Sequence, residues 1–141
     1  DNGSSEMKAG WGGDEAPLSV FRTVVGHSKS DITRIKNDIY IGDEANAKLE
    51  MLTLKYPIER GIVVNWDDME NIYNHIFKNE LHTDPKEHPI LLTEPPLNPK
   101  SNREKMIQIM FETFEVPSFY VAYQSLLSAF LLKNYTGLFA M

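Results

Sequence analysis

The chain has 141 residues, a formal net charge of −6 and no cysteine. Without cysteine it can form neither a disulfide framework nor a thiolate metal site. Apolar residues make up 42% and charged residues 24% of the chain, which is a globular composition, and the acidic balance argues against nonspecific nucleic-acid binding. The apolar stretch at 120–132 is too short to cross a bilayer, so no membrane insertion is expected.

The first part of the chain has the pattern of short strands separated by loops. Asp1-Asn2-Gly3-Ser4 has the composition of a turn, and residues 7–11 are predicted to form a strand that leaves it. The elements expected next, in chain order, are a loop at 12–17, a strand at 18–25, a polar loop at 26–39 without periodicity, and a short helix at 43–49.

The second half has the pattern of alternating helices and strands. Apolar residues at three- and four-residue steps predict an amphipathic helix at 66–81, with Asn65 as its N-cap. Ser101 and Glu104 form a capping-box pattern, which predicts a second helix that ends near residue 114. The remaining elements expected here are a buried strand at 88–93, a buried strand at 118–123 and a helix at 124–132. This order indicates an α/β fold with partly parallel strands.

Both ends of the sequence have the pattern of interrupted structure. Turn residues 1–4 normally follow a strand, and none precedes them here, while residues 135–141 have the pattern of a strand that is still running. We therefore expect the chain to be a piece of a longer protein.

The opening turn, Asp1–Ser5, has the residue types that a phosphate site needs. Glycine allows close approach of the backbone, successive N–H groups can bind an anion, and Lys8 supplies a compensating charge. A neighbouring carboxylate can hold Mg²⁺ through water. Turns of this composition are also ordinary hairpin connections, so the residues alone leave both interpretations open.

Gln124 follows the predicted strand at 118–123, at the end of the strand where α/β sheets place ligand groups. Its amide can both donate to and accept from a water, which suits the orientation of a nucleophile toward a phosphate. A glutamine at a helix start can instead cap backbone groups, and its position alone does not decide between these roles.

Three long segments and the opening turn together resemble actin, in the same order over nearly the whole chain. The first two segments are Leu54-Lys55-Tyr56-Pro57-Ile58-Glu59-Arg60-Gly61-Ile62-Val63-Val64-Asn65-Trp66-Asp67-Asp68-Met69 and residues 91–100 (LLTEPPLNPK). The third consists of residues 102–106 together with residues 108–114. The resemblance implies an incomplete actin-like ATPase fold of the ribonuclease H-like kind, a mixed sheet with flanking helices. It also implies a larger subdomain at 1–19 and 57–141, and a small inserted subdomain at 20–56 that contains the loop 27–39.

The resemblance to actin also implies roles for individual residues at an ATP and Mg²⁺ site. Asp1 would face the metal through water, Gly3, Ser4 and Ser5 would cradle phosphates, and Lys8 would be the phosphate lysine. Gln124 would position the hydrolytic water. A second phosphate loop would begin at or just after Met141, so we expect this chain alone neither to bind ATP well nor to hydrolyse it.

The sequence departs from the actin pattern at three informative positions. Ser5 stands where actin has glycine, and it is tolerable there if its φ is negative. Glu6 stands where actin has an apolar residue, and a carboxylate near triphosphate would weaken nucleotide binding, unless strand alternation turns it away. Arg60 replaces the histidine expected in this family, so methylation of that histidine is excluded.

The function implied is that of a cytoplasmic, cytoskeletal actin that polymerises into filaments with slow coupled ATP hydrolysis. Its partners would be other filament subunits and actin-binding proteins. The loop 27–39 is shorter and more charged than its actin counterpart, which together with Glu6 favours an alternative: a divergent actin-related protein that is a non-polymerising subunit of a larger complex. A truncated product without function is a further alternative.

Overall fold

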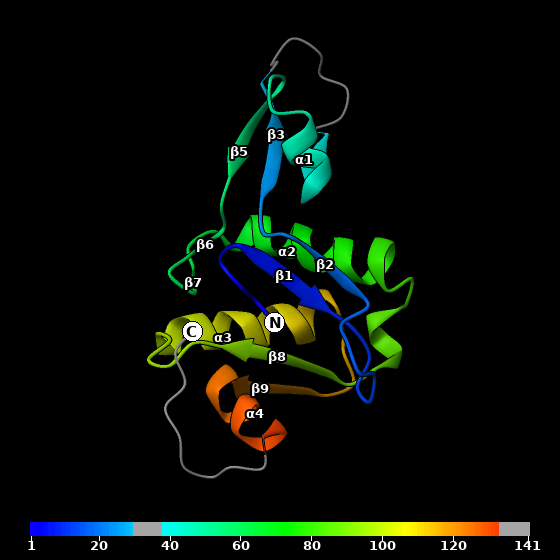
Figure 1. Cartoon of the computed structure of the whole chain (residues 1–141), viewed down its shortest axis with the longest axis vertical. Coiled ribbons are helices and arrows are strands. Elements are labelled where there is room, and N and C mark those ends of the chain that lie inside the picture. Colours follow the sequence, from blue (N-terminus) through cyan, green and yellow to red (C-terminus); the bar gives the residue numbers. More distant parts are fainter. Residues whose placement is uncertain (30–37, 133–141) are drawn as a thin grey trace. The chain divides into compact units, whose positions relative to one another are not determined.

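The computed structural model describes residues 1–29 and 38–132 and divides the chain into two compact units (Figure 1). The N-terminal unit comprises Asn2–Asp84. The C-terminal unit comprises Asp1 together with the chain from Pro85 onward. Both units contain strands and helices, as the predicted α/β class requires.

The N-terminal unit begins with an antiparallel pair of strands. Strand β1 (Glu6–Ala9) pairs with β2 (Ser19–Arg22), so that Met7 lies opposite Phe21, and a single bridge joins Asn2 to Met7. The predicted first strand and the loop after it are confirmed. The predicted strand at 18–25 is wrong in its second half, because the chain leaves the pair after Arg22 and begins a new strand at Val25.

A three-stranded antiparallel sheet follows, with β3 (Val25–Ser28) between β4 (Ile39–Ile41) and β5 (Leu52–Lys55). The predicted loop at 26–39 is therefore wrong at both ends, while residues 30–37 lie outside the described residues. The short helix α1 (Asp43–Ala47) is confirmed and packs on this sheet.

Close packing explains why a glycine occurs inside β3. A Cβ atom at Gly26 would lie 2.7 Å from Leu52 Cδ1 and 3.1 Å from Ala45 Cβ. Leu52 and Ala45 are both buried and form a small core with Val24. Gly26 therefore allows α1 and β5 to approach the central strand closely.

The actin-like segment 54–69 forms a tight hairpin and then a capped helix. Strands β6 (Ile58–Glu59) and β7 (Ile62–Val63) are joined by Arg60 and Gly61, whose φ angles of 50° and 80° are both positive. Two-residue hairpin turns of type I′ require this combination.

Helix α2 (Trp66–His75) continues as a π-helical segment, Ile76–Glu80, which confirms the predicted helix and its length. The predicted N-cap is also confirmed, because Asn65 Oδ1 accepts a hydrogen bond from the backbone N–H of Asp68 over 3.1 Å. The inward face of the helix is buried, as its periodicity predicts: Met69, Ile72, Tyr73, Ile76 and Phe77.

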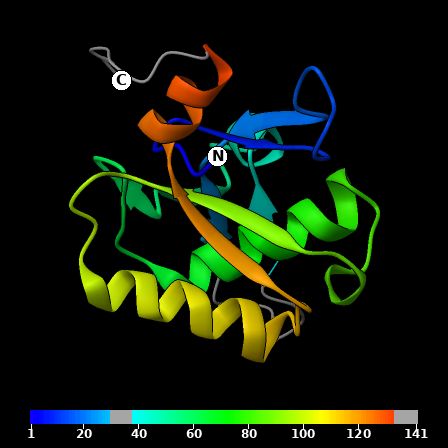
Figure 2. The same ribbon diagram turned by 90° about the horizontal axis from the view of Figure 1, so that it is seen from below.

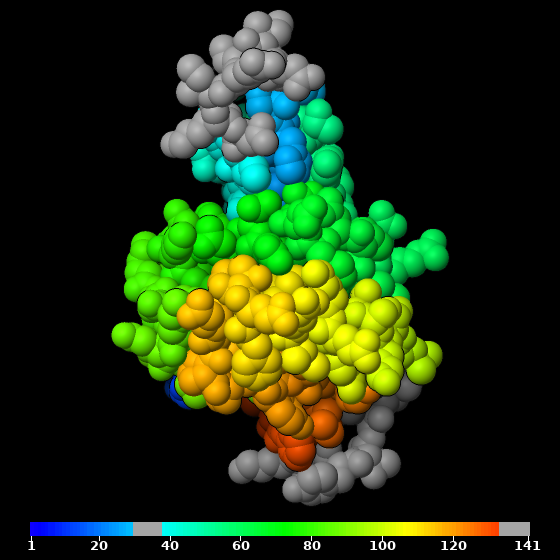
Figure 3. All heavy atoms as spheres, turned by 180° about the vertical axis from the view of Figure 1, so that it is seen from behind, coloured from blue at the N-terminus to red at the C-terminus, as the bar shows by residue number. Residues whose placement is uncertain are grey.

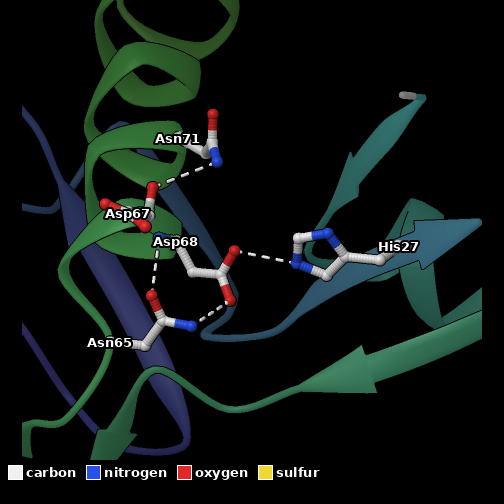
Figure 4. Close-up of polar contacts among 5 residues, drawn as sticks. All are labelled: His27, Asn65, Asp67, Asp68 and Asn71. Atoms are coloured by element: carbon white, nitrogen blue, oxygen red, sulfur yellow. Dashed lines mark hydrogen bonds and ion pairs between the residues drawn. The ribbon is translucent and has the colours of Figure 1, made fainter. Parts of the chain in front are cut away.

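A buried carboxylate connects α2 to the three-stranded sheet (Figure 4). Asp68 is 2% exposed; its Oδ1 accepts from His27 Nε2 over 2.8 Å and its Oδ2 from Asn65 Nδ2 over 2.7 Å. Because a buried charge is costly without partners, these contacts compensate the burial of Asp68 and fix β3 against the first turn of α2.

The C-terminal unit is built on two parallel strands, β8 (Ile90–Glu94) and β9 (Phe119–Tyr123), which lie side by side in Figure 2. Their register places Thr93 opposite Ala122. A 3₁₀ turn (Pro85–Glu87) precedes β8, and α4 (Gln124–Leu131) follows β9 directly.

The partly parallel arrangement is confirmed. The prediction that both strands are buried is wrong, because Leu91 and Tyr120, which pair with each other, are 50% and 63% exposed.

Helix α3 (Lys100–Gln108) and its π-helical continuation, Ile109–Thr113, connect the two strands, and Figure 3 shows their solvent-facing side. The capping box predicted at Ser101 and Glu104 is wrong. The helix begins earlier, at Lys100, and the carbonyl oxygen of Pro99 accepts from the backbone N–H groups of Asn102 and Arg103. Pro99 is the N-cap residue, and its backbone is extended, with a ψ of 136°.

Candidate functional site

Three polar side chains meet at the carboxyl ends of β8 and β9 in the C-terminal unit. The hydroxyl of Thr93 donates to Asp1 Oδ1 over 3.3 Å, and Gln124 Nε2 lies 3.4 Å from Thr93 Oγ1. Gln124 Nε2 also donates to Asp1 Oδ1. The fold thus brings together two residues that the sequence singled out, Asp1 and Gln124, at the sheet edge where α/β proteins bind ligands.

These contacts determine which end of the Gln124 amide faces Asp1. An ionised carboxylate only accepts hydrogen bonds, so the NH₂ group must point toward it. A hydroxyl both donates and accepts, which lets Thr93 donate to Asp1 while it accepts from the same NH₂ group. The amide oxygen is then directed to the other side, where it can accept a hydrogen bond from a water.

An ion pair between the buried Glu94 and the half-exposed Arg103 stabilises the end of β8 next to this cluster. Glu94 is 3% exposed and accepts hydrogen bonds from Arg103 on α3 and, over 2.9 Å, from Asn98 Nδ2. Burial alone raises the pKa of Glu94, but the hydrogen bonds from Arg103 and Asn98 outweigh it, so its pKa lies below the ordinary value. Because side chains alternate along a strand, Thr93 and Glu94 point to opposite faces of the sheet.

The opening turn lies in the N-terminal unit, except for Asp1, and it is held by hydrogen bonds from Thr23 and Gly61. Thr23 donates from Oγ1 to the carbonyl oxygen of Gly3 over 2.7 Å, and from its backbone N–H to Ser5 over 3.0 Å. The hydroxyl of Ser4 accepts from the N–H of Gly61 over 2.8 Å. A Cβ atom at Gly3 would clash with the carbonyl oxygen of Glu6, so this tight turn requires glycine.

A family model described as Actin matches residues 1–139. This chain belongs to the actin family. Its mixed α/β structure, with several sheets and flanking helices, agrees with an incomplete actin-like fold. Actin-family proteins in general bind a nucleotide and a divalent cation, associate with themselves and with actin-binding proteins, and are components of the cytoskeleton.

The two departures from the actin pattern at Ser5 and Glu6 have different consequences in the structure. Among the described residues, positive φ angles occur at four non-glycine residues, and Ser5 is not one of them, so its backbone is unstrained. Glu6 is different, because β1 exposes Glu6 and Lys8 and buries Met7 between them. Residues two apart in a strand share a face, so strand alternation keeps Glu6 on the same side of β1 as Lys8.

A dedicated protein cage for a metal ion is not found in the part of the chain that the structure describes, since no three acidic or histidine side chains converge there. The exposed carboxylate of Asp1 is compatible with a cation that keeps its water shell, which is the usual preference of Mg²⁺. No helix within residues 1–29 and 38–132 has the length and hydropathy needed to span a membrane.

The sequence alone did not identify Thr93, Thr23 or Arg103. Thr93 acts through Asp1 and Gln124, Thr23 through Gly3, and Arg103 through Glu94. Each of these partners lies on another element or loop. Thr93 had one detectable signal, because it ends a predicted strand next to a charged residue, as ligand-binding residues of α/β sheets often do.

Proposed function

We propose that this chain forms one wall of a Mg²⁺–ATP site in a cytoplasmic actin that assembles into filaments and hydrolyses ATP slowly. The observation that carries the proposal is the contact between Asp1 and Gln124 at the ends of β8 and β9. In the proposed division, residues 1–19 and 57–141 belong to the larger subdomain and residues 20–56 to the smaller, inserted one.

Asp1 and Gln124 have complementary roles in this proposal. Bound Mg²⁺ supplies charge neutralisation at the phosphates, and Asp1 holds its hydration shell through the carboxylate. Gln124 orients a water through the amide oxygen, because its NH₂ group is engaged by Asp1 and Thr93. Correct orientation of the nucleophile is a large part of catalysis in phosphoryl transfer, where the protein does little covalent chemistry.

The phosphate cradle is assigned to Gly3, Ser4 and Ser5, with Lys8 as the compensating cation. The hydrogen bonds from Thr23 to Gly3 and Ser5 support this assignment, since they hold the loop backbone in one conformation. Glu6 opposes it, because a carboxylate on the face of Lys8 repels phosphate. The proposal therefore includes weaker nucleotide binding than the same site would have without Glu6.

Titration of the full-length protein with ATP in the presence of Mg²⁺, followed by sedimentation at high salt, tests the proposal. We expect saturable binding that requires Mg²⁺, and a protein that pellets with ATP and stays soluble without it. Absence of Mg²⁺-dependent ATP binding would contradict the proposed site.

The second candidate is a non-polymerising actin-related subunit of a larger complex. The exposed Glu6 favours it, since weaker nucleotide binding weakens a nucleotide-driven assembly. In the same sedimentation assay, a protein that binds ATP and stays in the supernatant at every concentration would favour this candidate over the filament subunit.

A further inference from the structure

Thr93 occupies the centre of the cluster that the proposed function assigns to Asp1 and Gln124. It is 7% exposed and lies at the carboxyl end of β8, opposite Ala122 of β9. Its hydroxyl contacts both of the other side chains, at 3.3 Å to Asp1 and 3.4 Å to Gln124. Thr93 thus links the carboxylate assigned to the metal with the amide assigned to the water.

We propose that Thr93 is a positioning residue that sets the orientation of the Gln124 amide for ATP hydrolysis; this inference rests on the proposed function. The NH₂ group of Gln124 has two hydrogens, and Asp1 and Thr93 provide one acceptor each. With both hydrogens held, the amide plane is fixed and its oxygen points in one direction. With Asp1 alone, the amide can turn about the single remaining hydrogen bond.

The geometry of β8 separates this role from a role in folding. The backbone of Thr93 belongs to the parallel ladder of β8 and β9, which does not depend on its hydroxyl. Valine has nearly the same shape, is β-branched and favours strands. Asp1 is exposed, so water can replace the hydroxyl as its donor when threonine is changed to valine. Thr93→Val should therefore keep the fold and loosen the amide of Gln124.

Four variants of the full-length protein test this role: Thr93→Val, Thr93→Ser, Gln124→Ala and the double variant Thr93→Val/Gln124→Ala. Thr113→Val, an exposed threonine of the same unit, is the matched control. Thr93→Val should slow single-turnover ATP hydrolysis about tenfold, with the Kd for ATP changed less than twofold. Thr93→Ser should restore most of the rate, because it keeps the hydroxyl. In the Gln124→Ala background, Thr93→Val should have no further effect.

A second measurement does not depend on activity. The protein is labelled with ¹⁵N-glutamine, and the side-chain amide resonances of Gln124 are assigned by their loss in Gln124→Ala. Thr93→Val should shift these resonances and speed their exchange with solvent. The amide of Gln108, which donates to Glu112 over 2.9 Å, should not change and provides an internal reference.

The outcomes separate this inference from the proposed function. A wild-type protein that does not bind Mg²⁺–ATP overturns both. A wild-type protein that binds and hydrolyses ATP, together with a Thr93→Val variant of equal rate and unchanged Gln124 resonances, overturns the role of Thr93 alone. An equal loss of rate from Thr93→Val with and without Gln124 also overturns it, since Thr93 would then act independently of Gln124.

Discussion

The two units of the chain hold their parts of the candidate nucleotide site by different means. In the C-terminal unit, side chains hold side chains: Asp1 and Thr93 fix the amide of Gln124. In the N-terminal unit, Thr23 and Gly61 hold the opening turn through its backbone and through the hydroxyl of Ser4, while the side chain of Ser5 is exposed. Oriented side chains act on a reaction, whereas an ordered loop presents backbone N–H groups to an anion. Substitutions in the C-terminal unit should therefore change the rate of ATP hydrolysis. Substitutions in the N-terminal unit should change the affinity for ATP.

The largest effect should come from Arg103→Leu, which removes the charged partner of Glu94 at the end of β8. The Glu94 side chain is 2% exposed and would remain buried without its charged partner, which is strongly destabilising. The midpoint of urea unfolding should fall clearly below that of wild type. Lys105→Leu, exposed in the same helix, is the control and should leave the midpoint nearly unchanged.

The same ion pair predicts how stability depends on pH. The pKa of Glu94 is lowered from 4.5 in the folded protein, so its contribution is present above that value and is lost as pH falls through the folded pKa. Glu94→Gln should therefore be less stable than wild type at pH 7, and the difference should shrink below about pH 4.5. A difference that stays constant from pH 7 to pH 3 would count against this assignment.

The next largest effect should come from Thr23→Val. This variant tests whether the opening turn needs an ordered backbone to bind the phosphates of ATP. Thr23 is 1% exposed, and without its hydroxyl the carbonyl oxygen of Gly3 loses a hydrogen bond, a loss of about 1–3 kcal/mol. We expect weaker ATP binding, measured by titration, with an unchanged hydrolysis rate for bound ATP. Thr53→Val, on an exposed position of β5, is the control. A variant with normal affinity and slower hydrolysis would reverse the comparison between the units.

Glu6→Leu tests the electrostatic departure of the same loop. Removal of a carboxylate from the face of Lys8 should strengthen ATP binding roughly three- to tenfold, because the repulsion between solvated charges about 4 Å apart is about 1 kcal/mol. The gain should decrease at high salt, because salt screens exposed charges. Glu15→Leu, in the exposed loop before β2, should have no such effect. Equal affinities of wild type and Glu6→Leu would show that Glu6 does not face the phosphates.

The smallest effect concerns the hairpin that contacts Ser4. Arg60 has a φ of 50°, a conformation that asparagine adopts more easily than arginine. Arg60→Asn should stabilise the protein by about 0.5–1 kcal/mol in urea unfolding. Glu59→Asn, on the neighbouring strand position, should not stabilise it. A loss of stability in Arg60→Asn would mean that the arginine side chain contributes more than its backbone strain costs.

Local patterns predicted those parts of the fold that local interactions determine. The helix after Asn65 follows from its apolar period and its cap, and both are found. Strand β3 was missed because Gly26 and its polar neighbours have low strand propensity, whereas the pairing with β4 and β5 decides the outcome. The helix start at Lys100 was missed because Pro99 competes with the capping-box pattern at Ser101.

In the candidate site too, contacts between distant parts of the chain could not be predicted from local sequence patterns. Asp1 and Gln124 could be named from the sequence because the actin resemblance covers their segments, not because any spacing relates residues 123 positions apart. Thr93 and Arg103 act through partners on other elements, and nothing in their own neighbourhood in the sequence indicates those partners. A contact of this kind is determined by the register of β8 and β9 and by the packing of α3.

The most direct test of the account is single-turnover hydrolysis of Mg²⁺–ATP by the full-length protein and by its Gln124→Ala variant, with the Kd for ATP measured on both. If Gln124 orients the nucleophile, the variant should hydrolyse bound ATP on the order of a hundredfold more slowly, while its Kd stays within a few fold of wild type. Equal hydrolysis rates in the two proteins would contradict the central claim that the ends of β8 and β9 carry the reactive side of the site.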